Sequence, residues 1–517
     1  MDIIKIIEKI PEDKKTEIII TNNSTLQEKI KLIYSEEPPS ELVIGLVCSV
    51  GTDLESLTLK IKERLTLYDF NCEEIRISKD VISEITKKNS FKDNYERIDG
   101  LMTLGNKIRE DSECNYILAL GAITKINEIR EKSKTTSNQP KGIAYIINSI
   151  KHPEEVEELR KIYGNGFYLF GVFADKERRL KNLVDHKGVE KSKALKLIER
   201  DENEDDGHGQ HTRDTYHLSD FFISQDGNDD RLKNDIKRIF ELLFSNPFIT
   251  PTFDEFAMYM AFSSALRSAD LSRQVGAVIA KNKNIISTGA NDVPQFGGGL
   301  YWPDYEDDEI VDFPLGRDYT RGVDSNVEQK NEIIEDIISK IPKKSQDNIR
   351  KILKKSKIKD ITEYGRVVHA EMEAIIACAR GNISTIDTSI YCTTFPCHNC
   401  AKHIIASGIK RVIYIEPYPK SKAFDFHNES TTNDRKVIEK VLFEPFIGIG
   451  PKVFFSLFSI ANGGGRPLIR KDKDGKVKVW SENTASLRTK MLPVSYFEKE
   501  QLSVMLFGAM IGVKDAN

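Results

Sequence analysis

The chain has 517 residues, of which 39% are hydrophobic and 30% charged, and its net charge is -4. That length exceeds what one compact core supports, so we expect two or three domains. The excess of acid gives no support for nucleic acid as a substrate, and no apolar run is long enough to cross a bilayer. The first ten residues mix charge into apolar positions, unlike a signal peptide, so we expect a cytoplasmic protein without a membrane partner.

Short apolar runs alternate with amphipathic stretches in the first part of the chain. The runs predict buried strands at Leu42–Cys48, Tyr116–Leu120, Gly142–Asn148 and Phe167–Phe173. The stretches between them predict helices at Leu54–Leu65, Tyr95–Arg109 and Pro153–Ile162. This alternation is typical of an α/β domain with a doubly wound parallel sheet.

The turn after the first predicted strand is a candidate phosphate-binding loop. It joins a strand to a helix, which is the context of a P-loop. Its glycines are one residue too far apart for that motif, and no lysine accompanies Thr52. We therefore predict a degenerate, P-loop-like site that binds a regulatory nucleotide without efficient phosphoryl transfer. The residues assigned to it are Gly45, Ser49, Gly51 and Thr52. A plain strand–helix turn is the alternative.

A domain boundary is expected near the middle of the chain. Residues 199–213 are polar and acidic, which is typical of a solvated loop. Leu232–Phe244 has the apolar spacing of a connecting helix, and a new pattern begins near Pro251. We therefore assign residues 1–246 to a kinase-like nucleotide-binding domain and residues 247–517 to a second domain.

The second half predicts a further set of alternating elements. Helices are expected at Phe253–Arg267, Ala370–Ala379 and Cys400–Ser407, and strands at Gly276–Ala280, Ile285–Gly289, Ser389–Thr394 and Arg411–Glu416. Tyr301–Arg366 is highly charged and lacks strand signals, so we expect an insertion that is helical at Asn331–Ile341. Near the end, Gly463–Gly465 predicts a flexible break and Asp474-Gly475 a hairpin turn.

Two short motifs carry the chemistry. His369-Ala370-Glu371 and Pro396-Cys397-His398-Asn399-Cys400 together match the H-x-E…P-C-x-x-C pattern of zinc deaminases. One imidazole and two thiolates supply the three protein ligands of a catalytic zinc and leave a fourth position for water. We predict one Zn²⁺ per chain, held by His369, Cys397 and Cys400.

Glu371 is the predicted catalytic residue. A carboxylate beside zinc-activated water can take its proton, pass it to N3 of a cytosine-type ring and assist the departure of ammonia. A C-x-x-C pair can also belong to a structural zinc site or a redox motif, and His398 or His403 could then be a fourth ligand. The order of the two motifs, each followed by a helix, favours the deaminase. The other five cysteines are predicted to be small buried side chains.

Leu271–Pro294 and His369–Tyr414 resemble the deoxycytidylate deaminase family of the cytidine deaminase-like superfamily. The resemblance rests on Ser272-Arg273-Gln274-Val275-Gly276-Ala277-Val278-Ile279, Ile286-Ser287-Thr288-Gly289-Ala290-Asn291, Val368-His369-Ala370-Glu371 and Phe395-Pro396-Cys397-His398-Asn399-Cys400-Ala401-Lys402. It implies an α/β/α fold with a central mixed sheet and with zinc at two helix N-termini. It also implies that Asn291 contacts the deoxyribose and that Arg273 contacts a phosphate. Some relatives carry a second, structural zinc before the catalytic histidine, but no Cys or His occurs here from Leu218 to Val368.

A degenerate P-loop half joined to a deaminase half is similar to the bacterial anti-phage dCTP deaminases. Ser149–Val156 and Gly209–Thr215 also resemble segments of that family. The resemblance implies deamination of free dCTP and dCMP in phage defence, and we expect a homo-oligomer. Two alternatives stay open. One is a nucleic-acid cytosine or adenosine deaminase, which would need a basic surface. The other is a nucleotide-sensing regulatory protein with a structural zinc.

Overall fold

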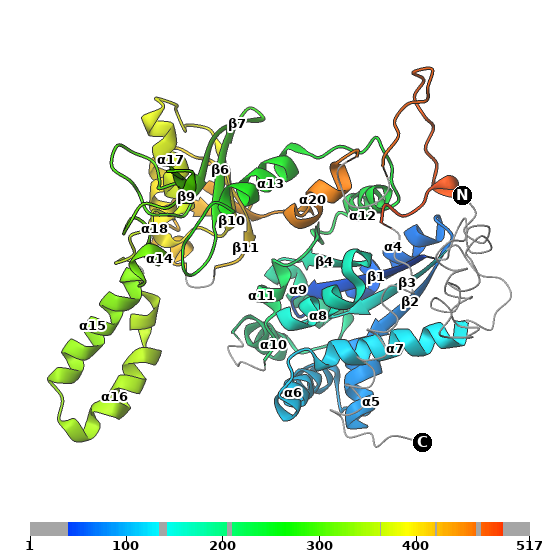
Figure 1. Ribbon diagram of the computed structural model, residues 1–517. Coiled ribbons are helices and arrows are strands. Elements are labelled where there is room, and N and C mark those ends of the chain that lie inside the picture. Colours follow the sequence, from blue (N-terminus) through cyan, green and yellow to red (C-terminus); the bar gives the residue numbers. More distant parts are fainter. Residues whose placement is uncertain are drawn as a thin grey trace, which may run out of the picture. The chain divides into compact units, whose positions relative to one another are not determined.

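The computed structural model describes residues 40–133, 142–203, 209–361, 363–418, 421–461 and 467–489. These residues form two compact units (Figure 1). The first contains the described residues up to 215, together with 225–249 and 459–489, and the second contains 216–224 and 250–458. Among the described residues, no helix combines the length and apolar character that a membrane span requires.

The first unit is built on parallel strands in the order β4–β1–β3–β2. Their bounds are Ser40–Cys48 for β1, Phe70–Arg76 for β2, Gly142–Asn148 for β3 and Phe167–Phe173 for β4. From β1 the chain moves out to β2, returns through β3 and then passes to the other side of β1, which is the winding of a doubly wound sheet. All nine residues of β1 are buried, as the continuous apolar run predicts for a central parallel strand.

Helices connect the strands of the first unit. They are α4 (Leu54–Thr66), α5 (Ser83–Thr86), α6 (Asn94–Ser112), α7 (Ile117–Ser133), α8 (Pro153–Tyr163), α9 (Lys176–Lys181), α10 (Lys191–Asn203) and α12 (Asp229–Leu243), with α11 (Thr212–Tyr216) at the division between the units. Short helical turns cover Ile77–Ile82, Gly164–Gly166 and Asn182–His186. The three helices expected between the first strands are thus confirmed, with ends that differ by up to three residues.

In the first unit, one predicted strand is wrong and one strand was not predicted. Tyr116–Leu120 lies at the start of α7, where the apolar run continues through Ile123 and Ile126 at helical spacing and is buried on several sides. A short apolar run of this kind occurs both in fully buried helices and in buried strands, and the length of the run helps to distinguish the two. β2 was not predicted, because its apolar residues Phe70, Cys72 and Ile75 are separated by polar ones and its sequence therefore lacks a continuous apolar run.

The second unit has a mixed sheet in the order β12–β13–β11–β10–β6–β7, as the resemblance implies. The strands are β6 (Gly276–Lys281), β7 (Asn284–Ala290), β10 (Ser389–Thr394), β11 (Arg411–Glu416), β12 (Thr431–Thr432) and β13 (Val441–Pro445). β6 runs antiparallel to both β7 and β10, whereas β10, β11, β13 and β12 are mutually parallel. β5 (Phe221–Ser224) also pairs antiparallel with β14 (Gly448–Ile449) in this unit.

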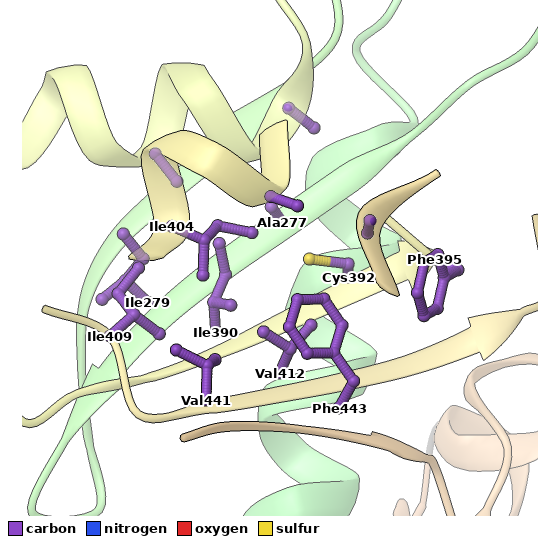
Figure 2. Packing of buried hydrophobic residues seen from close by; sticks show 14 of the residues in the cluster. Ala277, Ile279, Ile390, Cys392, Phe395, Ile404, Ile409, Val412, Val441 and Phe443 are labelled. Atoms are coloured by element: carbon purple, nitrogen blue, oxygen red, sulfur yellow. The ribbon is translucent and has the colours of Figure 1, made fainter. Parts of the chain in front are cut away.

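Two helices of this unit begin beside the predicted zinc ligands. The helices are α13 (Phe253–Ala265), α14 (Asp318–Arg321), α15 (Ser325–Ser339), α16 (Lys343–Lys355), α17 (Ala370–Arg380), α18 (His398–Ala406), α19 (Ala423–Phe426) and α20 (Pro451–Phe458). Ile404 of α18 packs on Ile390 and Val412 of the sheet in a buried cluster, which Figure 2 shows from close by. This cluster fixes α18 against the sheet.

The insertion differs from its prediction in one respect. It contains the expected helix as part of α15, and also a small hairpin of β8 (Asp304–Glu306) and β9 (Glu309–Val311), so the expected absence of strands is wrong. Both strands are short and almost wholly exposed, and therefore lack an apolar alternation. The turn at Asp474-Gly475 is confirmed, with Gly475 at φ +81°. Gly463–Gly465 lies outside the described residues.

Candidate active site

His369 stands at the start of α17, and the neighbouring backbone fixes its position. Val368 exchanges two backbone hydrogen bonds with Asp292, of 2.9 and 3.3 Å. Gly289 of β7 lies against the first turns of α17, where an added Cβ would be 2.1 Å from the carbonyl oxygen of Ala370. Because glycine has no side chain, helix and strand backbones approach closely here, and His369 and Glu371 are held on a rigid support.

Cys397 occupies the corresponding position at the start of α18. It follows β10, and its sulfur accepts a hydrogen bond from the backbone N–H of Cys400 at 3.4 Å. The unpaired N–H groups of a helix start carry partial positive charge, which stabilises a thiolate. Both helix N-termini implied by the resemblance are therefore present.

The three predicted ligands converge. The Nδ1 atom of His369 lies 3.4 Å from the sulfur of Cys397 and 3.4 Å from that of Cys400. In a tetrahedral zinc site with bonds of about 2.0 and 2.3 Å, nitrogen and sulfur ligands are roughly 3.6 Å apart. The donor set and its spacing therefore fit a zinc ion. Within the described part of the chain, the group of possible ligands comprises these three residues alone, so neither His398 nor His403 joins it.

The close approach of His369, Cys397 and Cys400 shifts the pKa of each of the three side chains. A hydrogen bond from Cys400, helped by His369, lowers the pKa of Cys397 to about 4. The same bond raises the pKa of Cys400 well above its usual value. The hydrogen bond with Cys397 raises the pKa of His369 to about 9. Burial raises the pKa of Glu371, which is only 4% exposed.

A cavity of about 390 Å³ opens onto these groups. The cavity is lined by His369, Glu371, Cys397, Asn291 and Arg273. Cys400 does not line it, but its sulfur lies within 4.8 Å of the ligand atoms of His369 and Cys397. The structure therefore brings together the residues predicted for zinc binding, proton transfer and substrate binding. A cavity of this size suits a small molecule. Sequence reasoning missed the part contributed by the insertion, since nothing in its charged pattern indicates which residues face inward. That part consists of Asp318, Asp324, Asn326, Val327, Lys330, Lys359, Ile361 and Gly365.

Comparison with known proteins agrees with this geometry. The model of the "Cytidine and deoxycytidylate deaminase zinc-binding region" matches residues 251–416. The deoxycytidylate deaminase of Enterobacteria phage T4 is 32% identical over 169 residues, which cover 32% of this chain and 78% of the relative. The chain belongs to the deoxycytidylate deaminase family. The phage T2 deoxycytidylate deaminase is also 32% identical, over 80% of its length, and that of Mus musculus is 27% identical, over 80%.

Asn291, expected from the family to contact the sugar, lies on the cavity wall with its amide already engaged. Its Oδ1 accepts from the backbone N–H of Val275 at 2.6 Å, and its Nδ2 donates to the carbonyl of Arg273 at 2.8 Å. Each end of an amide can form a second hydrogen bond, so one residue can both shape this loop and bind a ligand. The sugar contact stays a prediction.

Arg273, expected to contact a phosphate, is half-exposed at the cavity. Its guanidinium donates to Glu416 at 3.2 Å and lies over the ring of Tyr418, with 5.7 Å to the centroid. A phosphate could compete with this partly exposed carboxylate, because ion pairs near the surface contribute little to stability. The phosphate contact is a prediction as well.

In the loop of the first unit that is predicted to bind phosphate, several backbone N–H groups already donate hydrogen bonds within the protein. Val50 donates to Asp201, Thr52 to the carbonyl of Ser49, and Asp53 to Gln225. Gly45 is inside β1, where its missing side chain leaves room for Ile150, and Gly51, at φ +90°, abuts the backbone of Arg179. Phosphate binding here therefore stays a prediction, and it requires these N–H groups to change acceptors.

Proposed function

We propose that this chain hydrolyses the exocyclic amino group of free deoxycytidine nucleotides, converting dCMP, dCTP or both into dUMP and dUTP with release of ammonia. The single observation that carries the proposal is the convergence of three zinc-type ligands and the buried Glu371 on one cavity in the second unit. The similar phage and mouse proteins are deoxycytidylate deaminases by name, which supports the same substrate class.

The residues divide the work in the following way. Zinc, when held by His369, Cys397 and Cys400, supplies a water of lowered pKa. Glu371 would accept one proton of the attacking water and deliver it to ring N3, while the water oxygen bonds to C4 of the cytosine ring. Glu371 would then move the second proton to the amino group, so that the C4–N bond breaks to give ammonia and a uracil-type ring. Burial of Glu371 excludes bulk water from this exchange.

Two alternatives are less well supported. A structural zinc would call for four protein ligands, and the described residues supply three, which leaves the open position of a catalytic site. A nucleic-acid deaminase needs a basic channel for a strand, whereas the cavity mixes Asp270, Asp318 and Asp324 with Arg273 and lysines, and the chain is acidic overall.

The test is turnover by the purified full-length protein. dCMP, dCTP, CTP and a cytosine-bearing oligonucleotide are incubated with enzyme, and uracil products are quantified. We expect conversion of one or both deoxynucleotides; conversion of the oligonucleotide alone would refute the proposal. Glu371→Ala should keep its zinc and its melting temperature but lose about 10²–10⁴-fold in kcat, because the proton carrier is gone and every ligand remains. Wild-type turnover by that variant would show that the assigned mechanism is wrong.

We further propose a regulatory nucleotide site in the first unit and a role in phage defence. A cavity of about 230 Å³ beside Gly51 supports the nucleotide site, because Arg178, Lys181 and His186 among its walls offer donors to a phosphate. The defence role rests on the resemblance to anti-phage dCTP deaminases. Loss of protection in cells carrying Glu371→Ala would support that role, and equal protection would contradict it.

A further inference from the structure

The first unit holds a second cavity, separate from the one beside Gly51. Its volume is about 190 Å³, and its walls come from residues that follow β1 and β3, from α6 and from the start of α7. Figure 1 shows α6 and α7 at one side of the β1–β3–β2 sheet. In open parallel sheets, ligands bind at the carboxyl ends of the strands, which is where Val50 and Ser149 place this cavity.

Arg109 of α6 is the group that marks this cavity as a site. It is 2% exposed and lines the wall, and its Nη2 donates to Glu155 at 2.8 Å. Its Nε and Nη1 are buried and have no hydrogen-bond partner among the described residues. Leaving a buried donor unsatisfied costs about 1–3 kcal/mol, more for a charged group, so these two donors favour a ligand that brings acceptors.

The remaining polar walls are charge-balanced. Lys151 donates to the carbonyl of Cys48 at 2.6 Å and pairs with Asp201 at 3.2 Å, just as Arg109 pairs with Glu155. A carboxylate at Arg109 would therefore add a buried charge that nothing there compensates, whereas a neutral acceptor would not. Arg97 also lines the cavity and is partly exposed. Among the described residues, no carboxylate lies within 4 Å of its guanidinium.

The other walls are apolar and the space is small. Ile77, Ile82, Ile98, Leu101, Met102 and Leu118 contribute them. The volume is about six times the ~30 Å³ that one water occupies in the liquid, which accommodates a single ring with its substituents. Ser149 adopts φ +74°, a backbone conformation uncommon outside glycine, and such residues cluster at ligand sites.

We infer that this cavity binds the neutral heterocyclic base of a nucleoside or nucleotide. The unpaired Nε–H and Nη1–H groups of Arg109 donate to separate acceptors on the ligand. The apolar side chains contact the ring faces, and any phosphate on the ligand remains outside, toward Arg97. The cavity shares no residue with the deaminase cavity or with the cavity beside Gly51, although Val50 of the turn after β1 contributes to its wall.

Titration calorimetry on the full-length protein tests the inference with adenosine, guanosine, cytidine, uridine and, as an apolar carboxylate, benzoate. We expect at least one nucleoside to bind with Kd below about 1 mM. Ile98→Phe fills the cavity, and Arg109→Lys keeps the charge opposite Glu155 but removes the two unpaired guanidinium donors. Each should weaken that binding at least tenfold, whereas Glu110→Gln, on the exposed side of α6, should not.

The variants also separate this site from the deaminase cavity, since a nucleoside bound there would be unaffected by Ile98→Phe. Melting temperatures measured without ligand confirm that each variant is folded, and if Arg109→Lys unfolds, Ile98→Phe alone decides. The inference is overturned if no nucleoside binds, if Ile98→Phe binds as tightly as wild type, or if benzoate binds here in place of the nucleosides.

Discussion

Gly289→Ala should impair the active site without replacing any of the residues predicted to bind zinc or substrate or to transfer protons. The added Cβ would lie 2.1 Å from the carbonyl oxygen of Ala370 and 2.6 Å from the backbone nitrogen of Ala374. Real Cβ contacts essentially never fall below 3.0 Å, so α17 must move by about 0.9 Å or β7 must distort. Overpacking of this kind costs about 1–3 kcal/mol. For a unit of this size we expect the melting temperature to fall by roughly 2–12 °C.

The same displacement carries His369 and Glu371 away from the cysteines of α18. A shift of 1 Å in a catalytic group costs about 10²-fold in rate, so kcat/KM for dCMP should fall by that order and zinc should bind less tightly. Gly381→Ala is the matched control: it lies at the other end of α17 at φ -86°, and its nearest contacts would be 3.4 Å. If Gly289→Ala keeps full zinc content and a kcat/KM within twofold of this control, close strand–helix packing does not position the site.

Three further changes probe separate features. Cys400→Ser should abolish stoichiometric zinc binding, measured by atomic absorption, because a hydroxyl replaces a thiolate ligand; full zinc content would exclude Cys400 from the site. Asn291→Ala should lower kcat/KM for dCMP by about tenfold more than for CMP, and an equal effect on both would leave the residue a loop-shaping role only. Burial raises the pKa of Asp254, but hydrogen bonds from Arg411 and Tyr391 outweigh it and lower the pKa below 3.8. Asp254→Asn should therefore destabilise by on the order of 1 kcal/mol above pH 4, and the difference in urea unfolding should vanish as pH falls through the lowered pKa. A difference that persists at pH 2 would contradict this.

Strong periodicity was sufficient to predict the strands at the centre of both sheets and several of the helices between them. β3, β4, β10 and β11 have the bounds that their apolar runs predict, because a buried parallel strand has a short continuous signal with turn residues on both sides. The failures share one cause. The start of α7 and the strand β2 depend on what packs around them, and a local pattern does not contain that information.

The zinc cluster was predictable because its ligands lie in two short motifs, each at a helix start. The walls of the cavity were not. Lys330 and Lys359 are two among many lysines of a charged insertion, and only the folded structure brings them to the same cavity as Glu371. The burial of Arg109 could not be predicted either, because a charged residue in a long amphipathic helix is normally solvent-exposed. Arg109 is buried because α6 packs against its neighbours.

This contrast has a physical origin. A zinc ligand is useful only within about 0.2 Å of its proper distance, so His369 and Cys397 lie where helix starts pack tightly on the sheet. A wall that contacts a sugar or a phosphate tolerates larger displacements, because water and long side chains adjust. It can therefore come from loops and from an inserted pair of helices without weakening the chemistry. Shared zinc motifs thus identify the reaction, whereas under the proposed function we expect the choice among deoxycytidine nucleotides to depend on the side chains that the insertion and the Arg273 loop place around the same cavity.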